Sequence, residues 1–307
     1  MIRKIKFEDL ESAVNRAYEK LKDNNEGVAD KFFATDNENA FGIAVVLADG
    51  RVIKRGDADM PVAMDSIAKV PVSTVLLTQY TPDEVIRKSG YLDPKDPAVK
   101  KAKVPTGRHG LRELSAIEPQ GDGDGKMDIL SERLTDLMGV SPVLDDRLYK
   151  AYLDEARNAD TVNVLAASGY YLYDDAELTV DIYSRLRALK ASATQLATMG
   201  ATIAADGFNP LTKENVFDGV VSAPIVAMMA VKGPHKMSKP WLVGAGIPAK
   251  NSRAGAMAGV LPGVMGIAAV SPRLNEAGIP VKAALAIKEI ANELQFNVFN
   301  SARIEIE

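Results

Sequence analysis

Ser66 and Lys69 stand three residues apart in the segment MDSIAKV, directly before an apolar run. If a helix begins here, both side chains share one face and the amine lies within reach of the hydroxyl. A serine becomes a nucleophile when a neighbouring base removes its proton, and a lysine serves as that base when burial or a nearby cation lowers its pKa. The pair therefore predicts acyl-transfer chemistry. The alternative is an ordinary helix start, with Ser66 as the cap and Lys69 on the wet surface.

The elements on either side of this pair follow from the hydrophobic pattern. Residues 7–21 carry apolar side chains at helical spacing, and residues 41–56 read as two strands joined at an Asp-Gly turn. Residues 254–271 form a second pair of apolar strands around Pro262-Gly263, and residues 281–294 have the pattern of an amphipathic helix. Between these ends the pattern is mostly helical.

This order predicts an α/β fold in which one antiparallel sheet is covered by the N- and C-terminal helices. The sheet lobe comprises residues 1–65 and 218–307, and residues 66–217 form an inserted helical lobe. In the helical lobe, Thr81 caps a helix that begins at Pro82. Pro71 falls in the second turn of a helix starting near Ser66, where it would remove one backbone hydrogen bond.

Composition excludes several classes of protein. The 307 residues carry a formal net charge of −4, so no overall basic surface for nucleic acid or acidic membranes is expected. Cysteine is absent, which excludes disulfides and thiolate metal sites, and no run of residues is apolar enough to span a bilayer. The N-terminus lacks the apolar core of a signal peptide, so we expect a cytoplasmic protein.

Two further patterns are interpreted as structural. A polar loop is predicted over residues 91–127, with its basic residues 95–103 in solvent. Within it, residues 121–128 (GDGDGKMD) resemble a calcium-binding loop, but the acidic residue that should close such a loop is missing. We therefore predict a glycine-rich loop leading into a helix at Ile129. The two histidines, His109 and His235, are too few for a common zinc site, and we expect neither a metal nor a cofactor.

Three segments in order resemble the serine-dependent glutaminases, whose fold is related to that of the β-lactamases and penicillin-binding proteins. The segments are FGIAVVLADGRVIKRGDADMPVAMDSIAKV before and around Ser66, QLATMGATIAADGFNPLTKENV at 195–216, and GIPAKNSRAGAMAGVLPGVMGIAAVSPRLNEAGIPVK at 246–282. Together they extend over nearly the whole chain. A penicillin-binding or β-lactamase-type enzyme would require a secretion signal and an intact Lys-[Ser/Thr]-Gly strand, and this chain shows neither.

The resemblance implies a role for each residue of the dyad site. Ser66 is the nucleophile, Lys69 the base, and Tyr183 the relay of the proton to the leaving nitrogen; without the resemblance, Tyr183 would be read as helix packing. The oxyanion donors are the backbone N–H groups of Ser66 and Arg253. Lys250, on the neighbouring strand, is expected to lower the pKa of Lys69 or to face the substrate; otherwise it is a surface lysine.

The same resemblance assigns the substrate contacts and shows where this chain departs from the family. Asn158 matches a residue expected on an α-carboxylate, and His235 replaces a tyrosine. Glu113 stands where an asparagine would meet the α-carboxylate, and Ala151 stands where an acidic residue would bind the ammonium group. A carboxylate at position 113 would repel free glutamine.

The sequence therefore predicts a cytoplasmic amidohydrolase of the glutaminase type. Its partner is a small-molecule amide, L-glutamine or an analogue, which passes through an acyl-enzyme. We also expect a homodimer or homotetramer. The alternative function, based on Ala151 and Glu113, is a catalytically impaired protein of the same fold with altered ligand or partner binding.

Overall fold

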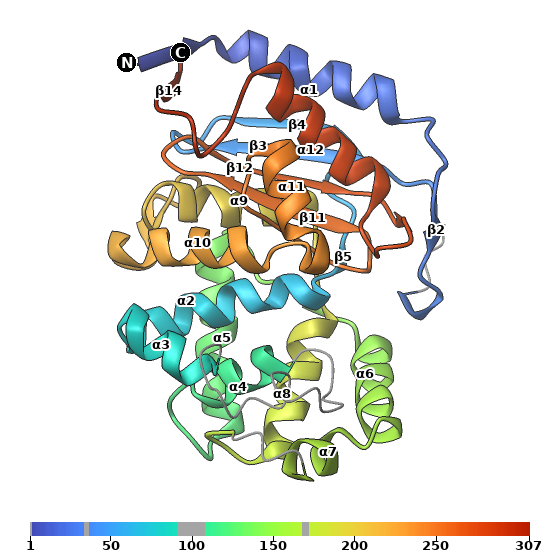
Figure 1. Cartoon of the computed structure of the whole chain (residues 1–307), viewed down its shortest axis with the longest axis vertical. Coiled ribbons are helices and arrows are strands. Elements are labelled where there is room, and N and C mark those ends of the chain that lie inside the picture. The colour runs from blue at the N-terminus through green and yellow to red at the C-terminus, as the bar shows by residue number, and fades with distance from the viewer. Residues whose placement is uncertain (1, 34–36, 91–107, 168–171) are drawn as a thin grey trace.

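The computed structural model describes residues 2–33, 37–90, 108–167 and 172–307. Its centre is a five-stranded antiparallel sheet in the order β10-β11-β12-β3-β4 (Figure 1). The strands are β3 (Gly42–Leu47), β4 (Val52–Gly56), β10 (Ala249–Asn251), β11 (Ala256–Leu261) and β12 (Met265–Val270). Both predicted hairpins are confirmed. They join through β3 and β12, where Gly42 pairs with Val270 and Leu47 with Met265.

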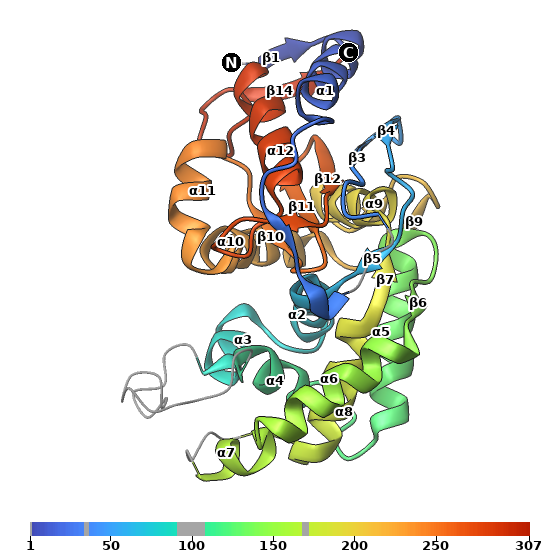
Figure 2. The same ribbon diagram turned by 90° about the vertical axis from the view of Figure 1, so that its right-hand side faces the viewer.

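Helices from the two ends of the chain cover one face of the sheet, as predicted. α1 (Phe7–Leu21) and α12 (Val281–Glu293) pack on it through apolar side chains that include Leu10, Val14, Ile287 and Ile290. Figures 1 and 2 show the termini together at the end of this lobe, where β1 (Ile2–Ile5) pairs in parallel with β14 (Arg303–Ile306).

The other face of the sheet is covered by α9 (Ala193–Ala204), which approaches the strands unusually closely. A Cβ atom added at Gly266 on β12 would lie 2.0 Å from the carbonyl oxygen of Ala197 and 2.3 Å from the nitrogen of Ala201. Glycine is therefore required at this crossing. The predicted division placed α9 in the helical lobe, although it packs on the sheet.

The helical lobe lies beneath the sheet in Figure 1. It contains α2 (Lys69–Gln79), α3 (Pro82–Ser89), α4 (Arg108–Ser115), α5 (Gly123–Met138), α6 (Asp146–Asn158), α7 (Thr161–Ala167) and α8 (Ala176–Ala188). The predicted start of α3 is confirmed, because Thr81 and Glu84 form a reciprocal capping box.

Smaller elements complete the fold. A three-stranded sheet in the order β5-β7-β6 is formed by β5 (Val62–Ala63), β6 (Val143–Leu144) and β7 (Leu189–Ala191). Two further short pairs are β2 (Val28–Ala29) with β13 (Arg273–Leu274), and β8 (Phe208–Asn209) with β9 (Glu214–Asn215). Two further helices, α10 (Ser222–Lys232) and α11 (Ser238–Ala245), precede β10. Across the described ranges, no helix is long and apolar enough to cross a membrane.

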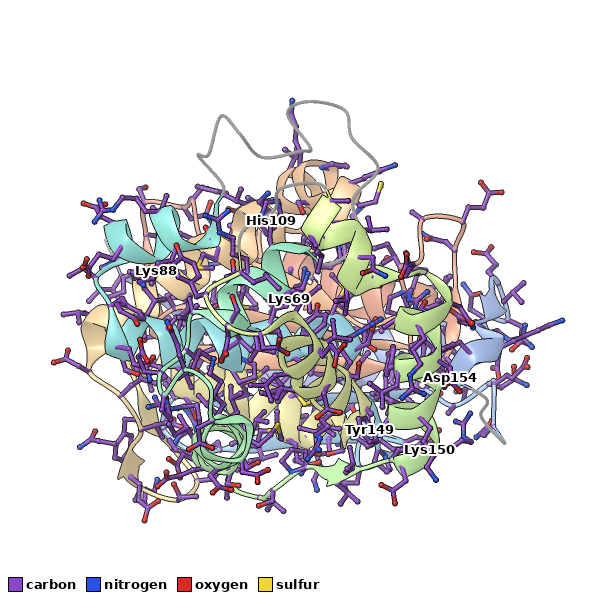
Figure 3. All side chains as sticks on the ribbon, turned by 90° about the horizontal axis from the view of Figure 1, so that it is seen from below. Lys69, Lys88, His109, Tyr149, Lys150 and Asp154 are labelled. Atoms are coloured by element: carbon purple, nitrogen blue, oxygen red, sulfur yellow. The ribbon has the colours of Figure 1, made fainter. Side chains whose placement is uncertain are left out.

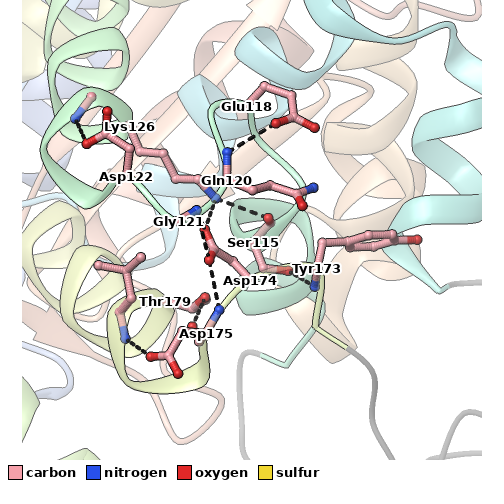
Figure 4. A network of polar contacts seen from close by, with 12 residues as sticks. Ser115, Glu118, Gln120, Gly121, Asp122, Lys126, Tyr173, Asp174, Asp175 and Thr179 are labelled. Atoms are coloured by element: carbon pink, nitrogen blue, oxygen red, sulfur yellow. Dashed lines mark hydrogen bonds and ion pairs between the residues drawn. The ribbon is translucent and has the colours of Figure 1, made fainter.

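The predicted loop over residues 91–127 is wrong over its second half. Residues 91–107, with the basic cluster, lie outside the described residues, but the part from 108 contains α4 and the start of α5. Asp122 caps α5 through the amide of Gly125, so the helix begins at Gly123 and not at Ile129. The buried ammonium of Lys126 pairs with Asp174 at 2.6 Å and donates to the Ser115 carbonyl (Figure 4).

Candidate active site

Ser66 lies on a short 3₁₀ turn, Asp65–Ala68, that leads directly into α2 at Lys69. Side chains three residues apart eclipse one another in a 3₁₀ helix, so Ser66 and Lys69 project from the same side. Ser66 is not a helix cap, because α2 follows Ala68 and has no side-chain cap. Pro71 stands in the first turn of α2, where amides need no intrahelical partner, so the expected loss of a hydrogen bond does not arise.

Lys69 and Tyr183 approach each other across the backbone of α4. A Cβ atom added at Gly110 would lie 2.8 Å from Cε of Lys69 and 2.9 Å from the hydroxyl oxygen of Tyr183. Both groups therefore lie against the same point of the α4 backbone, and a side chain at position 110 would displace them. Tyr183 is buried on α8, and Lys69 is half-buried. The alternative that Lys69 lies on the wet surface is wrong.

Lys250 is a buried lysine on β10, at the sheet side of the site. Its ammonium donates to the carbonyls of Lys232 (2.6 Å) and Gly233 (2.8 Å) at the end of α10. Desolvation, followed by the charge of Lys69, lowers the pKa of Lys250 to about 7, and the charges of Glu113 and Asp65 oppose this shift. The alternative that Lys250 is a surface lysine is therefore wrong.

His235 and Glu113 belong to the same electrostatic cluster. Desolvation, followed by the charges of Lys250 and Lys69, lowers the pKa of His235 to about 4. The imidazole is therefore neutral at pH 7, although the residue as a whole is exposed. Glu113 is buried on α4, and its negative charge acts on Lys250. Lys250 and His235 from the sheet lobe thus interact electrostatically with Lys69 of the helical lobe, and Glu113 acts on Lys250.

Asp65 is the most densely bonded residue beside Ser66. Its Oδ1 accepts from Nε and Nη2 of Arg187 at 3.0 and 2.9 Å and from the hydroxyl of Tyr152 at 3.0 Å. Its Oδ2 accepts from the backbone N–H of Arg253 at 3.3 Å and from the hydroxyl of Ser66 at 3.5 Å. Burial alone would raise the pKa of Asp65, but the charges of Arg187 and Arg253 outweigh it and lower the pKa to about 2.

The backbone amide of Arg253, predicted as an oxyanion donor, thus already has an acceptor. Ser252 fixes the loop that carries it, because its hydroxyl donates to the Ala63 carbonyl at 2.6 Å and accepts from the Ala254 amide. The Arg253 side chain lies near Asp30 and over the rings of Phe32 and Phe33.

Asn158 does not join this cluster in the way the resemblance implies. It is exposed at the C-terminal end of α6, whereas the residue of α6 that reaches Asp65 is Tyr152. Six residues of helix separate the two positions, about 9 Å along the axis. Figure 3, viewed from below, shows Lys69 and His109 near the middle of the lobe, with Asp154 away to one side on α6. Only the resemblance supports a substrate contact for Asn158.

The sequence analysis missed four residues of the site: Asp65, Gly110, Tyr152 and Arg187. Arg187 offered a signal, because it stands one helical turn after Tyr183 and therefore on the same face of α8. A charge on a buried helix face needs a partner of opposite charge. Among the described residues, no group of three or more histidine, aspartate or glutamate side chains is placed to hold a metal ion.

The fold and the site together define a class: an antiparallel sheet under terminal helices, joined to a helical lobe that carries a serine and a lysine at the junction. This is the β-lactamase-like fold of the glutaminases. A solved structure described as the probable glutaminase YbaS superposes with a TM-score of 0.88 at 28% identity, over 97% of this chain and 100% of its own. A probable glutaminase from Bacillus subtilis, 22% identical, shares the fold with a TM-score of 0.80 over 94% of this chain and 96% of its own.

Sequence comparison gives the family. The glutaminase family model matches residues 113–299. A glutaminase of Parabacteroides distasonis is 34% identical over 323 aligned residues, covering 100% of this chain and 99% of that protein. One from Bacteroides thetaiotaomicron is 35% identical over 98% of each. The chain belongs to the glutaminase family.

Proposed function

We propose that this protein hydrolyses the side-chain amide of L-glutamine, or of a related amide, to the acid and ammonia. The observation that supports this best is the approach of both Lys69 and Tyr183 to Gly110. Ser66 stands one 3₁₀ turn before Lys69, so its side chain projects from the same side of the chain as the lysine. This arrangement supports a nucleophile, a base and a proton relay acting together, as a serine amidohydrolase requires.

The reaction follows from these positions. The Ser66 oxygen attacks the amide carbon while the Lys69 amine takes the hydroxyl proton. The tetrahedral intermediate collapses, the C–N bond breaks, and Tyr183 delivers its proton to the departing ammonia and takes the proton that Lys69 received from Ser66. Water then attacks the ester, its proton passes to the neutral Lys69, and the Ser66 oxygen leaves with that proton.

Lys250 is coupled electrostatically to Lys69, because the charge of Lys69 helps to lower the pKa of Lys250 to about 7. The backbone carbonyls of Lys232 and Gly233 hold the Lys250 amine in place. We propose that Glu113, His235 and Asn158 contact the substrate, as the resemblance implies.

The test is ammonia release from L-glutamine, measured for the wild type and Ser66→Ala. We expect Ser66→Ala to lose about 10³-fold or more of kcat with unchanged folding, because no other group can form the acyl-enzyme. Ser131→Ala, at an exposed position on α5, is the matched control and retains full activity. Equal rates of ammonia release by the wild type and Ser66→Ala would contradict the proposal.

One observation favours the alternative, a catalytically impaired protein. The Arg253 amide donates to Asp65 and is therefore engaged in this structure. If the wild type releases no ammonia from several amides and Ser66 resists an electrophilic glutamine analogue, the impaired protein is the better description. If the analogue labels Ser66 but the protein does not hydrolyse glutamine, the catalytic residues are functional and the substrate is a different amide.

A cytoplasmic location and a homodimer or homotetramer remain part of the proposal. Neither metal nor cofactor enters the steps above.

A further inference from the structure

The two oxygens of the Asp65 carboxylate have different partners. Oδ1 is held at 2.9–3.0 Å by Arg187 and Tyr152, which belong to α8 and α6. Oδ2 instead accepts from the Ser66 hydroxyl at 3.5 Å and from the Arg253 amide at 3.3 Å, and it lies 3.8 Å from Nε of Arg253. One oxygen therefore contacts both the proposed nucleophile and a proposed oxyanion donor.

The backbone holds the carboxylate in this position. Asp65 has a φ of 43°, a left-handed conformation that is uncommon for a residue other than glycine. Its side chain is only 1% exposed, so water does not compete for its oxygens. The carboxylate is kept ionised by the charges of Arg187 and Arg253, as its lowered pKa shows.

The tetrahedral intermediate of amide hydrolysis places a negative oxygen next to the serine and its backbone donors. A carboxylate oxygen that already accepts from one of these donors competes for it and repels the new charge. The contacts of Oδ2, the ion pair with Arg253 included, are longer than those of Oδ1. We therefore expect a ligand oxygen to displace Oδ2 more easily than Oδ1.

We propose that Asp65 Oδ2 occupies the oxyanion position in the resting protein and acts as an internal brake, which the substrate must displace before Ser66 attacks. Asp65 is a positioning residue in this scheme, since it acts through the Ser66 hydroxyl and the Arg253 amide. The inference rests on the proposed function and adds to it a carboxylate that opposes the intermediate.

The test is the affinity for butylboronic acid, an analogue of the anionic intermediate, measured by calorimetry on the full chain. The Ser66 oxygen forms a bond to boron, and the hydroxyl proton passes to Lys69, so that the adduct is a tetrahedral anion. Asp65→Asn keeps the shape of the side chain and removes its charge. We expect it to tighten boronate binding about tenfold or more, with the KM for a neutral amide changed less than about threefold.

Two further variants exclude simpler explanations. Asp65→Asn leaves Arg187 unpaired, so the double variant Asp65→Asn/Arg187→Gln removes both charges and leaves the net charge unchanged; it should bind the boronate as tightly. Asp174→Asn also removes a buried, lysine-paired carboxylate, but in the helical lobe away from Ser66, and it should leave boronate affinity unchanged.

Equal or weaker boronate binding by the folded Asp65 variants would overturn the brake. If butylboronic acid binds neither the wild type nor any variant, and Ser66→Ala behaves the same way, then the nucleophile itself is wrong. The proposed function would then fail, and the brake with it.

Discussion

At the scale of single residues, the chemistry depends on Gly110 having no side chain. A methyl group there would press on Lys69 Cε at 2.8 Å and on the Tyr183 hydroxyl at 2.9 Å. We expect Gly110→Ala to lower kcat about 10²-fold, because small displacements of reacting groups are costly. Ammonia release under saturating glutamine measures this effect.

The matched control is Gly244→Ala on α11. An added Cβ there meets only the end of the Lys288 side chain, at 3.5 Å, which is ordinary contact. Gly244→Ala should keep full activity and gain about 0.5–1 kcal/mol of stability, as alanine does in place of a helical glycine. Full activity in Gly110→Ala would contradict the account of the dyad.

Lys250 predicts a dependence of stability on pH. Its folded-state pKa is lowered from 10.5 to about 7, so between these values the unfolded chain binds more protons than the folded one. Raising the pH from 7 toward 10.5 therefore favours folding, and the benefit of deprotonation is absent below pH 7. We expect the Tm of wild type, relative to Lys250→Met, to rise from pH 7 to 10. If the difference in Tm between the wild type and Lys250→Met, measured by differential scanning calorimetry, does not change with pH, the lowered pKa of Lys250 is contradicted.

The sequence predicts one site for Ser66, Lys69, Tyr183 and Lys250, because a motif or a family pattern marks each of them. It did not predict that Asp65 would pair with Arg187, since these residues are 122 positions apart and nothing local connects them. Burial creates that pair, because neither charge can remain in the interior alone. The hydrogen bond from the Arg253 amide to Asp65 could not be predicted either, because these two residues are also far apart in the sequence.

At the scale of elements, a buried ion pair between Lys126 and Asp174 connects α5 to the segment before α8. The Lys126 and Asp174 side chains are 1% and 6% exposed. Lys126→Met leaves Asp174 without its counter-charge, and we expect a loss of about 3–5 kcal/mol in the free energy of unfolding. Urea denaturation measures this loss.

The double variant Lys126→Met/Asp174→Asn should recover part of the loss, because no unpaired charge remains. Arg157→Met breaks an exposed pair with Asp154 on α6 and should cost less than about 1 kcal/mol. Equal losses for Lys126→Met and Arg157→Met would show that the buried pair has no special role.

The elements that could be predicted are those whose pattern is complete in a short window. The two hairpins and the helices α1, α3 and α12 have clear periodicity or caps. α4 is only eight residues long and contains a glycine, so its sequence has weak helix propensity. Its formation depends on packing against α2, α3 and α8, which a local pattern does not reveal.

At the scale of the whole molecule, the sheet lobe and the helical lobe share one hydrophobic core. The core cluster under α9 continues without a break into the helices of the inserted lobe. We therefore expect a single cooperative unfolding transition, with near- and far-ultraviolet circular dichroism giving coincident curves. Two separate transitions would show that the lobes fold independently.

Assembly is also tested at this scale. A chain of 32.9 kDa should elute with two or four times that mass in size-exclusion chromatography with light scattering, if the predicted homodimer or homotetramer forms. A mass equal to one chain across the concentration range would contradict that prediction.

The central claim, that Ser66 is the nucleophile, is tested most directly by intact-mass and peptide mass spectrometry after incubation with 6-diazo-5-oxo-L-norleucine. A covalent complex formed with this reagent has been described for the glutaminase YbgJ of Bacillus subtilis. We predict one adduct per chain in the wild type, located on Ser66, and none in Ser66→Ala. An adduct on another residue, or an equal adduct in Ser66→Ala, would contradict the account.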